Sequence, residues 1–108
     1  MIYSIEQIRG KIVPIAKKYD IPKVYLFGSY ARGDATEASD IDVLIEHRGS
    51  TIRGLWDLGA FYLDLNEQLN KSVDVVTLDA LEASYTKERS PQLNARITQE
   101  RISLYEAQ

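Results

Sequence analysis

The chain has 108 residues and a formal net charge of −3, with 44% hydrophobic and 27% charged residues. This fits one globular domain over residues 1–108 and excludes a second large core, while the acidic balance argues against direct nucleic-acid binding. The absence of cysteine excludes disulfides and thiolate metal sites, and no membrane-spanning run or signal-peptide pattern occurs, so we expect a cytoplasmic protein without a membrane partner.

The first predicted element is a helix over residues 4–19. Ser4 and Gln7 form a capping-box pattern at its start. Apolar residues recur at helical spacing and define one stripe that we expect to be buried: Ile5, Ile8, Ile12, Ile15 and Tyr19. Pro14 has no N–H to donate to the carbonyl of Gly10, so we expect a bend there and not a break. This helix is predicted to be scaffold.

A strand and a sharp turn follow. Residues 24–27 are apolar and strand-forming, and Gly28 and Ser29 end them abruptly. Gly28 allows a tight turn and the close approach of an anion, and Ser29 could open a short helix whose free N–H groups favour phosphate. Arg32 could neutralise phosphate charge. It could equally pair with the acidic residues that follow, Asp34 or Glu37.

Acidic and apolar residues alternate at the next predicted strand, residues 41–45. Asp40 and Asp42 would lie on one face, roughly 6.6 Å apart along the strand. Two carboxylates this close repel each other unless a cation binds to them, and magnesium prefers such oxygen ligands. An isolated pair of this kind is more often solvated surface. Together with the Gly28–Ser29 turn, however, it predicts a nucleoside triphosphate bound through magnesium.

A third helix is predicted from a cap at Ser50 or Thr51 to about Leu69. Its stripe at helical spacing consists of Leu55, Leu58, Tyr62, Leu65 and Leu69. Three further large apolar residues lie off this stripe: Trp56, Phe61 and Leu63. The excess indicates either looser core packing or a partner-binding patch. The single histidine, His47, precedes the helix and is interpreted as a solvated turn residue.

The last two predicted elements are a strand over residues 73–77 and a helix from Ser90-Pro91 towards Tyr105. Asp74 and Val76 would share one face of the strand. Asp74 could be an edge charge that deters aggregation, but the other two aspartates call for a third ligand or base, so we predict that it joins them. Basic residues of the last region are interpreted as solvated helix face: Lys87, Arg89, Arg96 and Arg101.

These motifs resemble a known superfamily. Gly28-Ser29, ten residues, and then Asp40-Ile41-Asp42 have the G-S-x10-D-x-D form of the DNA polymerase beta-like nucleotidyltransferases, and residues 28–45 look like their minimal members, the MNT-type antitoxins. Asp74 matches the third acidic residue of the family, and the resemblance covers nearly the whole chain. It implies a small α/β (α+β) fold, in which helices pack mainly on one face of a mixed sheet and the aspartates lie in a cleft on the other.

The resemblance also implies an activity and a partner. The enzyme would be a magnesium-dependent nucleotidyltransferase with two Mg²⁺ ions and ATP as substrate. Its catalytic residues and metal ligands would be Asp40, Asp42 and Asp74. Its nucleotide-binding residues would be Gly28, Ser29 and Arg32. The partner would be a HEPN-type ribonuclease toxin, silenced by transfer of AMP to one of its tyrosines. Two alternatives are an antitoxin that acts by contact alone and a nucleotidyltransferase subunit for a small-molecule or nucleic-acid acceptor.

Overall fold

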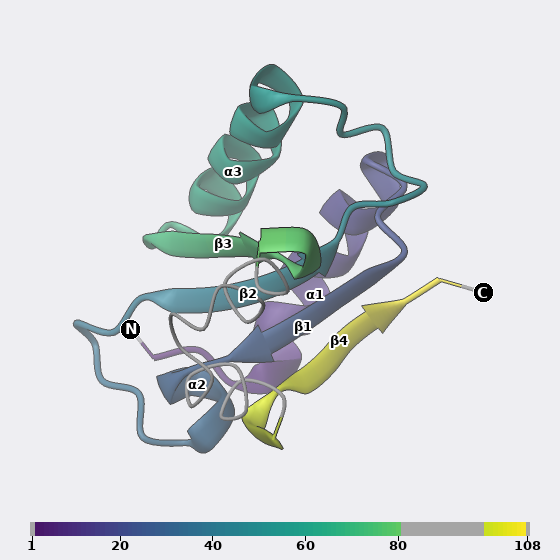
Figure 1. Cartoon of the computed structure of the whole chain (residues 1–108). Helices are drawn as coiled ribbons and strands as arrows, with labels where there is room; N and C mark the ends of the chain where they lie inside the picture. The colour runs from purple at the N-terminus through teal and green to yellow at the C-terminus, as the bar shows by residue number, and fades with distance from the viewer. Residues whose placement is uncertain (1, 81–98, 108) are drawn as a thin grey trace.

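The computed structural model describes residues 2–80 and 99–107 (Figure 1). In chain order, the elements are α1 (Ile5–Lys18), β1 (Lys23–Phe27), α2 (Ser29–Arg32), β2 (Ile41–Glu46), α3 (Leu55–Leu69), β3 (Val73–Thr77) and β4 (Ile102–Glu106). The strands form one sheet in the order β3-β2-β1-β4. Strand β1 pairs antiparallel with β2 and β4, whereas β2 and β3 are parallel. The predicted mixed α/β class is confirmed.

Helices α1 and α3 cover one face of this sheet. Alternate strand residues, such as Leu26 and Val43, point into a core shared with both helices. On the opposite face a smaller apolar cluster surrounds the buried Leu44: Tyr25, Phe27, Val76 and Leu78. The helices therefore pack mainly on one face, as predicted. Of the helices that the structure describes, none combines the length and the apolar character that crossing a membrane requires.

Helix α1 begins as the sequence predicts. The Ser4 hydroxyl accepts a hydrogen bond from the N–H of Gln7, and the Gln7 side chain accepts one from the N–H of Ser4, which completes the capping box. The helix continues through Pro14 to Lys18 without a break. Its buried residues are Ile8, Ile12, Ile15 and Ala16. The predicted scaffold stripe is thus present over the central turns.

Helix α3 differs from its prediction in both start and phase. It begins at Leu55 after Gly54, and no side chain caps it. Ser50 instead belongs to the preceding turn, where its hydroxyl donates to the carbonyl of His47. The buried side chains are Phe61, Leu65 and Leu69. Leu55, which the prediction placed on the buried stripe, is 86% exposed. The predicted stripe is therefore correct at Leu65 and Leu69 and wrong at Leu55 and Tyr62, because this helix carries apolar residues on more than one side.

The predicted C-terminal helix is wrong at its end. Residues 102–106 form strand β4, which pairs along the outer edge of β1. Leu104 is buried in the core, and the Arg9 guanidinium donates to the carbonyls of Ser103 and Leu104. Within the described residues the sheet therefore has four strands and not the predicted three. The predicted start at Ser90-Pro91 lies outside the described residues, as do three of the four basic positions: Lys87, Arg89 and Arg96.

Candidate active site

The turn after β1 lies in close contact with the carboxylate of Asp42. Gly28 has φ +76°, in the region that favours glycine, and its carbonyl accepts hydrogen bonds from the N–H groups of Ala31 and Arg32. A Cβ atom at this position would collide with Oδ2 of Asp42. Gly28 is therefore required by the position of Asp42 as well as by the turn. Sequence reasoning gave this glycine a role in anion approach and missed its contact with the acid.

Asp42 and Asp74 are neighbours across the parallel ladder. They are register partners of β2 and β3, whose strands lie about 4.8 Å apart in such a pair. Residues that are paired directly across two neighbouring strands point to the same face of the sheet, so the two side chains lie on one side. Both line the same cavity. Asp42 is half-buried, and Asp74 is exposed. The structure thus brings together two of the three predicted acids.

The pKa of Asp42 is raised to about 6. The largest cause is burial, which disfavours the charged form, followed by the charge and the hydrogen bond of Asp74 and then by the charge of Asp40. The positive charge of Arg32 acts in the opposite direction. Negative charge is therefore concentrated at the end of the sheet that carries the predicted site.

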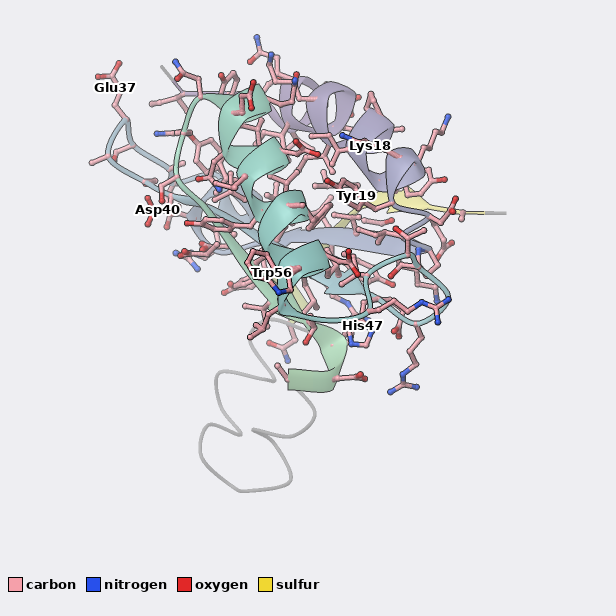
Figure 2. The ribbon with its side chains drawn as sticks, turned by 90° about the horizontal axis from the view of Figure 1, so that it is seen from above. Lys18, Tyr19, Glu37, Asp40, His47 and Trp56 are labelled. Carbon is pink, nitrogen blue, oxygen red and sulfur yellow. The ribbon has the colours of Figure 1, made fainter. Side chains whose placement is uncertain are left out.

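Asp40 lies beside this pair and outside the strand. It immediately precedes β2 and is exposed, on the side of the molecule that also carries Glu37 (Figure 2). Its charge reaches Asp42, as the pKa of that residue shows. Over residues 2–80 and 99–107, no set of three or more His, Cys, Asp or Glu side chains forms a ready metal-binding group. The three-aspartate metal site stays a prediction.

The Asp42–Asp74 pair itself suits magnesium. This ion is commonly held by one or two carboxylates, with waters and substrate phosphates completing its coordination. A divalent cation beside the two acids would relieve their repulsion, which contributes to the raised pKa of Asp42. The donor set present in the chain therefore fits a metal that arrives together with a nucleotide.

A cavity of about 650 Å³ opens beside the two acids. This size lies within the range of small-molecule sites. Four of its lining residues come from α3: Leu55, Leu58, Gly59 and Tyr62. The sheet supplies the other five: Phe27, Asp42, Asp74, Val75 and Val76. The sequence interpretation missed Tyr62 as a site residue because it placed the side chain in the core. The surplus of apolar residues on this helix was the available signal.

Ser29 and Arg32 belong to the short helix α2. Ser29 is its first residue, and its carbonyl accepts hydrogen bonds from the N–H groups of Gly33 and Asp34. The exposed Arg32 guanidinium pairs with Asp34 (Nε to Oδ2, 3.3 Å) and with Glu100 (3.2 Å). Pairing with Asp34 was one of the two alternatives for this arginine. Glu100, from the chain just before β4, was not foreseen.

The chain is similar in sequence to proteins of a known family. The chain matches the family model described as the nucleotidyltransferase domain over residues 5–104. A relative from Methanocaldococcus jannaschii, to which the function of protein adenylyltransferase is assigned, is 40% identical over 78 residues, which cover 72% of this chain and 82% of the relative.

Solved structures share the fold. The chain superimposes on one from a toxin–antitoxin complex with AMP-PNP, with a TM-score of 0.67, 22% identity and coverage of 93% of this chain and 74% of the other. A complex of a tri-AMPylated Shewanella oneidensis HEPN toxin with an MNT antitoxin gives a TM-score of 0.61, 19% identity and coverage of 95% and 73%. Because the family model covers far more than half of the chain, the protein belongs to the nucleotidyltransferase domain family and is a nucleotidyltransferase.

Proposed function

We propose that this protein is an antitoxin that transfers AMP from ATP to a tyrosine of a HEPN-type ribonuclease toxin. The observation that carries the proposal is the pairing of Asp42 and Asp74 beside a cavity, with Gly28 fitted against Asp42. The assigned function of the M. jannaschii relative supports protein as the acceptor. The solved complex of an MNT antitoxin with an AMPylated HEPN toxin supports the identity of the partner.

Each site residue has a role in this proposal. Asp40 and Asp42 would hold magnesium and through it the triphosphate, and Asp74 would complete the acidic site and accept the proton of the attacking hydroxyl. When bound, two magnesium ions would supply charge stabilisation for the attacking and leaving oxygens. Gly28 and Ser29 would lie against the terminal phosphates. Arg32 would contribute positive charge near them after exchanging an acidic partner for phosphate.

The reaction requires an open side next to the acids, where an acceptor hydroxyl can approach. The N-terminal half of α3 forms that side. Leu55 and Tyr62 line the cavity, and the neighbouring Trp56 is 93% exposed at the end of the helix (Figure 2). Large apolar side chains exposed beside a charged site are typical of a protein-binding surface. We therefore place the toxin against α3, with its acceptor tyrosine entering the cavity from that side.

Transfer of labelled AMP tests the proposal. The purified chain, magnesium and α-labelled ATP are incubated with a HEPN-type ribonuclease toxin, and label on the toxin is measured. Asp42→Asn should reduce the rate at least about 100-fold, because the site loses several kcal/mol of transition-state stabilisation. Asp20→Asn, at an exposed acid that follows α1, is the matched control and should keep the wild-type rate. An unlabelled toxin, with an active MNT-type pair labelled in parallel, would refute the proposal.

A second candidate is neutralisation of the toxin by contact alone. The exposed apolar residues of α3 favour it, because they offer a binding surface whether or not the site is active: Leu55, Trp56 and Leu63. The Asp42→Asn variant separates the two. A contact inhibitor would still neutralise the toxin in growing cells after this substitution, whereas a transferase would lose protection together with AMP transfer.

A further inference from the structure

Tyr62 is the hydroxyl-bearing side chain of the cavity. Among the described residues that line it, the others are the two aspartates, a glycine, and aliphatic or aromatic side chains without a hydroxyl. Tyr62 is 39% exposed, and it lines this space together with Asp42 and Asp74. The side chain of a tyrosine therefore lines the same cavity as the acids that are proposed to direct nucleotidyl transfer. The sequence-based placement of Tyr62 in the core gave it no such role.

The other tyrosines that the structure describes are not among the residues that line this cavity. The hydroxyl of Tyr3 donates to the carbonyl of Leu69 at 2.6 Å. That of Tyr19 donates to Asp64, next to Lys18 at the end of α1 (Figure 2), and this bond together with burial raises its pKa to about 12. Tyr30 is buried in the core, and Tyr25 lies under the Arg101 guanidinium at 4.4 Å on the sheet face. Tyr62 is thus distinguished by its place and by its accessibility.

We propose that Tyr62 is an acceptor for AMP within its own chain, so that the protein adenylylates itself when no toxin occupies the cavity. This inference rests on the proposed function, because it uses the same donor and the same acids. The Tyr62 oxygen attacks the α-phosphorus of ATP and forms a new P–O bond. The bond from the α-phosphorus to the bridging oxygen of the β-phosphate breaks, and pyrophosphate leaves with the electron pair. The phenolic proton passes to Asp74 and then to solvent.

Modification at this position would control the enzyme. Because Tyr62 lines the cavity, an AMP group attached to it would occupy space between α3 and the two acids. A second ATP could then not reach Asp42, and the surface that the proposal assigns to the toxin would carry a bulky anionic group. The modified chain should therefore be inactive towards the toxin. A toxin tyrosine that enters the cavity first would compete with Tyr62 for the same α-phosphorus.

Incubation of the chain alone with magnesium and α-labelled ATP tests this inference. The wild type should become labelled, and peptide mass spectrometry should place one AMP on Tyr62. Tyr62→Phe should lose the label, whereas Tyr25→Phe, which keeps its ring under Arg101, should keep it. Equal thermal melting of the two variants excludes a folding defect. Label that remains on Tyr62→Phe, or that maps to another residue, would overturn the inference.

Dilution and a parallel arm with toxin sharpen the test. The labelled fraction per unit time should not change when the chain is diluted, because donor and acceptor lie in one molecule; a rate that falls in proportion would overturn transfer within the chain. If the toxin is labelled and the chain alone is never labelled, the inference fails and the proposed function stands. If Tyr62 is labelled and the toxin is not, the proposed acceptor is wrong and the inference stands.

Chemical protection gives a readout that needs no turnover. The magnesium complex of α,β-methylene-ATP cannot donate AMP, because the bond that must break has been replaced. Its binding beside Asp42 should slow the nitration of Tyr62 by tetranitromethane, with no slowing in Asp42→Asn. Equal nitration of wild-type Tyr62 with and without a saturating amount of this compound would show that the hydroxyl lies outside the nucleotide site.

Discussion

Helices α1 and α3 have 14 and 15 residues and pack on the same face of the sheet, yet they use their apolar residues differently. The central turns of α1 bury Ile8, Ile12 and Ile15, and its N-terminus is fully capped. Helix α3 buries Phe61, Leu65 and Leu69 in its later turns but exposes Leu55 and Trp56 at an uncapped start. Helix α1 therefore serves as scaffold, whereas α3 combines a buried part with an exposed apolar start that is proposed to be functional.

Removal of a core side chain from α3 should have the largest effect on the free energy of unfolding. Phe61 is fully buried and meets the Tyr19 ring edge-on at 5.4 Å, where α3 contacts the end of α1. Phe61→Ala should lower this free energy by about 3–5 kcal/mol, because it leaves a cavity between the helices. Urea denaturation followed by circular dichroism measures the change. A loss similar to that of an exposed position would contradict the division of α3 into two halves.

Gly28→Ala should have the second largest effect, which is expected on AMP transfer as well as on stability. The backbone at Gly28, with φ +76° and ψ −155°, lies in a region that costs other residues about 1–3 kcal/mol, and the new methyl group must also displace the Asp42 carboxylate. AMP transfer should fall to the level of Asp42→Asn, while the helices stay folded. Gly10→Ala provides the control, since a Cβ atom there meets nothing within 4 Å. Full activity in Gly28→Ala would show that Asp42 does not need its present position.

The third largest effect should come from Asp42, which lies beside Asp74, and should appear as a dependence of the free energy of unfolding on pH. The folded-state pKa of Asp42 is about 6 against 3.8 for the free side chain, so the native state binds more protons between these values. The metal-free protein should therefore lose stability as pH rises through this window. Asp42→Asn should remove the loss and stabilise the protein at pH 7 by about 1 kcal/mol, a figure reduced for partial solvent exposure.

Urea titrations in EDTA at pH 4 and pH 7 measure this difference. The stabilisation by Asp42→Asn should be small at pH 4, where the wild-type acid is protonated, and should shrink at pH 7 when magnesium is added. Asp20→Asn should show neither change. A wild-type protein that gains stability between pH 4 and pH 6 more steeply than Asp42→Asn would have the opposite sign and would refute the raised pKa.

Trp56→Ala should have the smallest effect on folding. Its side chain is 93% exposed, so the free energy of unfolding should change by no more than about 0.5 kcal/mol. Binding of the toxin should nevertheless weaken, because a large aromatic side chain leaves the proposed contact surface. Calorimetric titration measures the affinity, with Ile2→Ala as a control at another exposed apolar residue. Equal loss of affinity in both variants would argue against a specific role of α3.

The strands and turns that carry the predicted site residues could be predicted because their sequence signals are local. Strand-forming residues before the Gly28 turn predicted β1, and the alternation of acidic and apolar residues predicted β2. The capping box predicted the start of α1. Alternation in residues 73–77 correctly placed Asp74 on one face of β3, and the parallel register then brought it opposite Asp42. A prediction of this kind requires only that the spacing of apolar residues within each short segment indicate a strand or a helix.

Features that depend on distant segments were missed. Strand β4 pairs with β1, which lies near the other end of the chain, and nothing within residues 90–105 signals that partner; the segment was therefore predicted to be helical. The phase of α3 was ambiguous because apolar residues occur all around its first turns, and only packing against α1 selects Phe61 over Tyr62. For the same reason, the sequence did not show that Tyr62 of α3 lines the cavity.

The parallel β2–β3 ladder has a consequence for how such a protein can change over evolutionary time. Main-chain hydrogen bonds, which every residue type except proline can supply, hold Asp42 opposite Asp74. Drift elsewhere in the chain can therefore be extensive without separating the two acids. A slip of a single residue in this pairing would instead turn one carboxylate towards the helices. Insertions and deletions between residues 42 and 74 should accordingly be tolerated in the connecting turns and selected against within the strands.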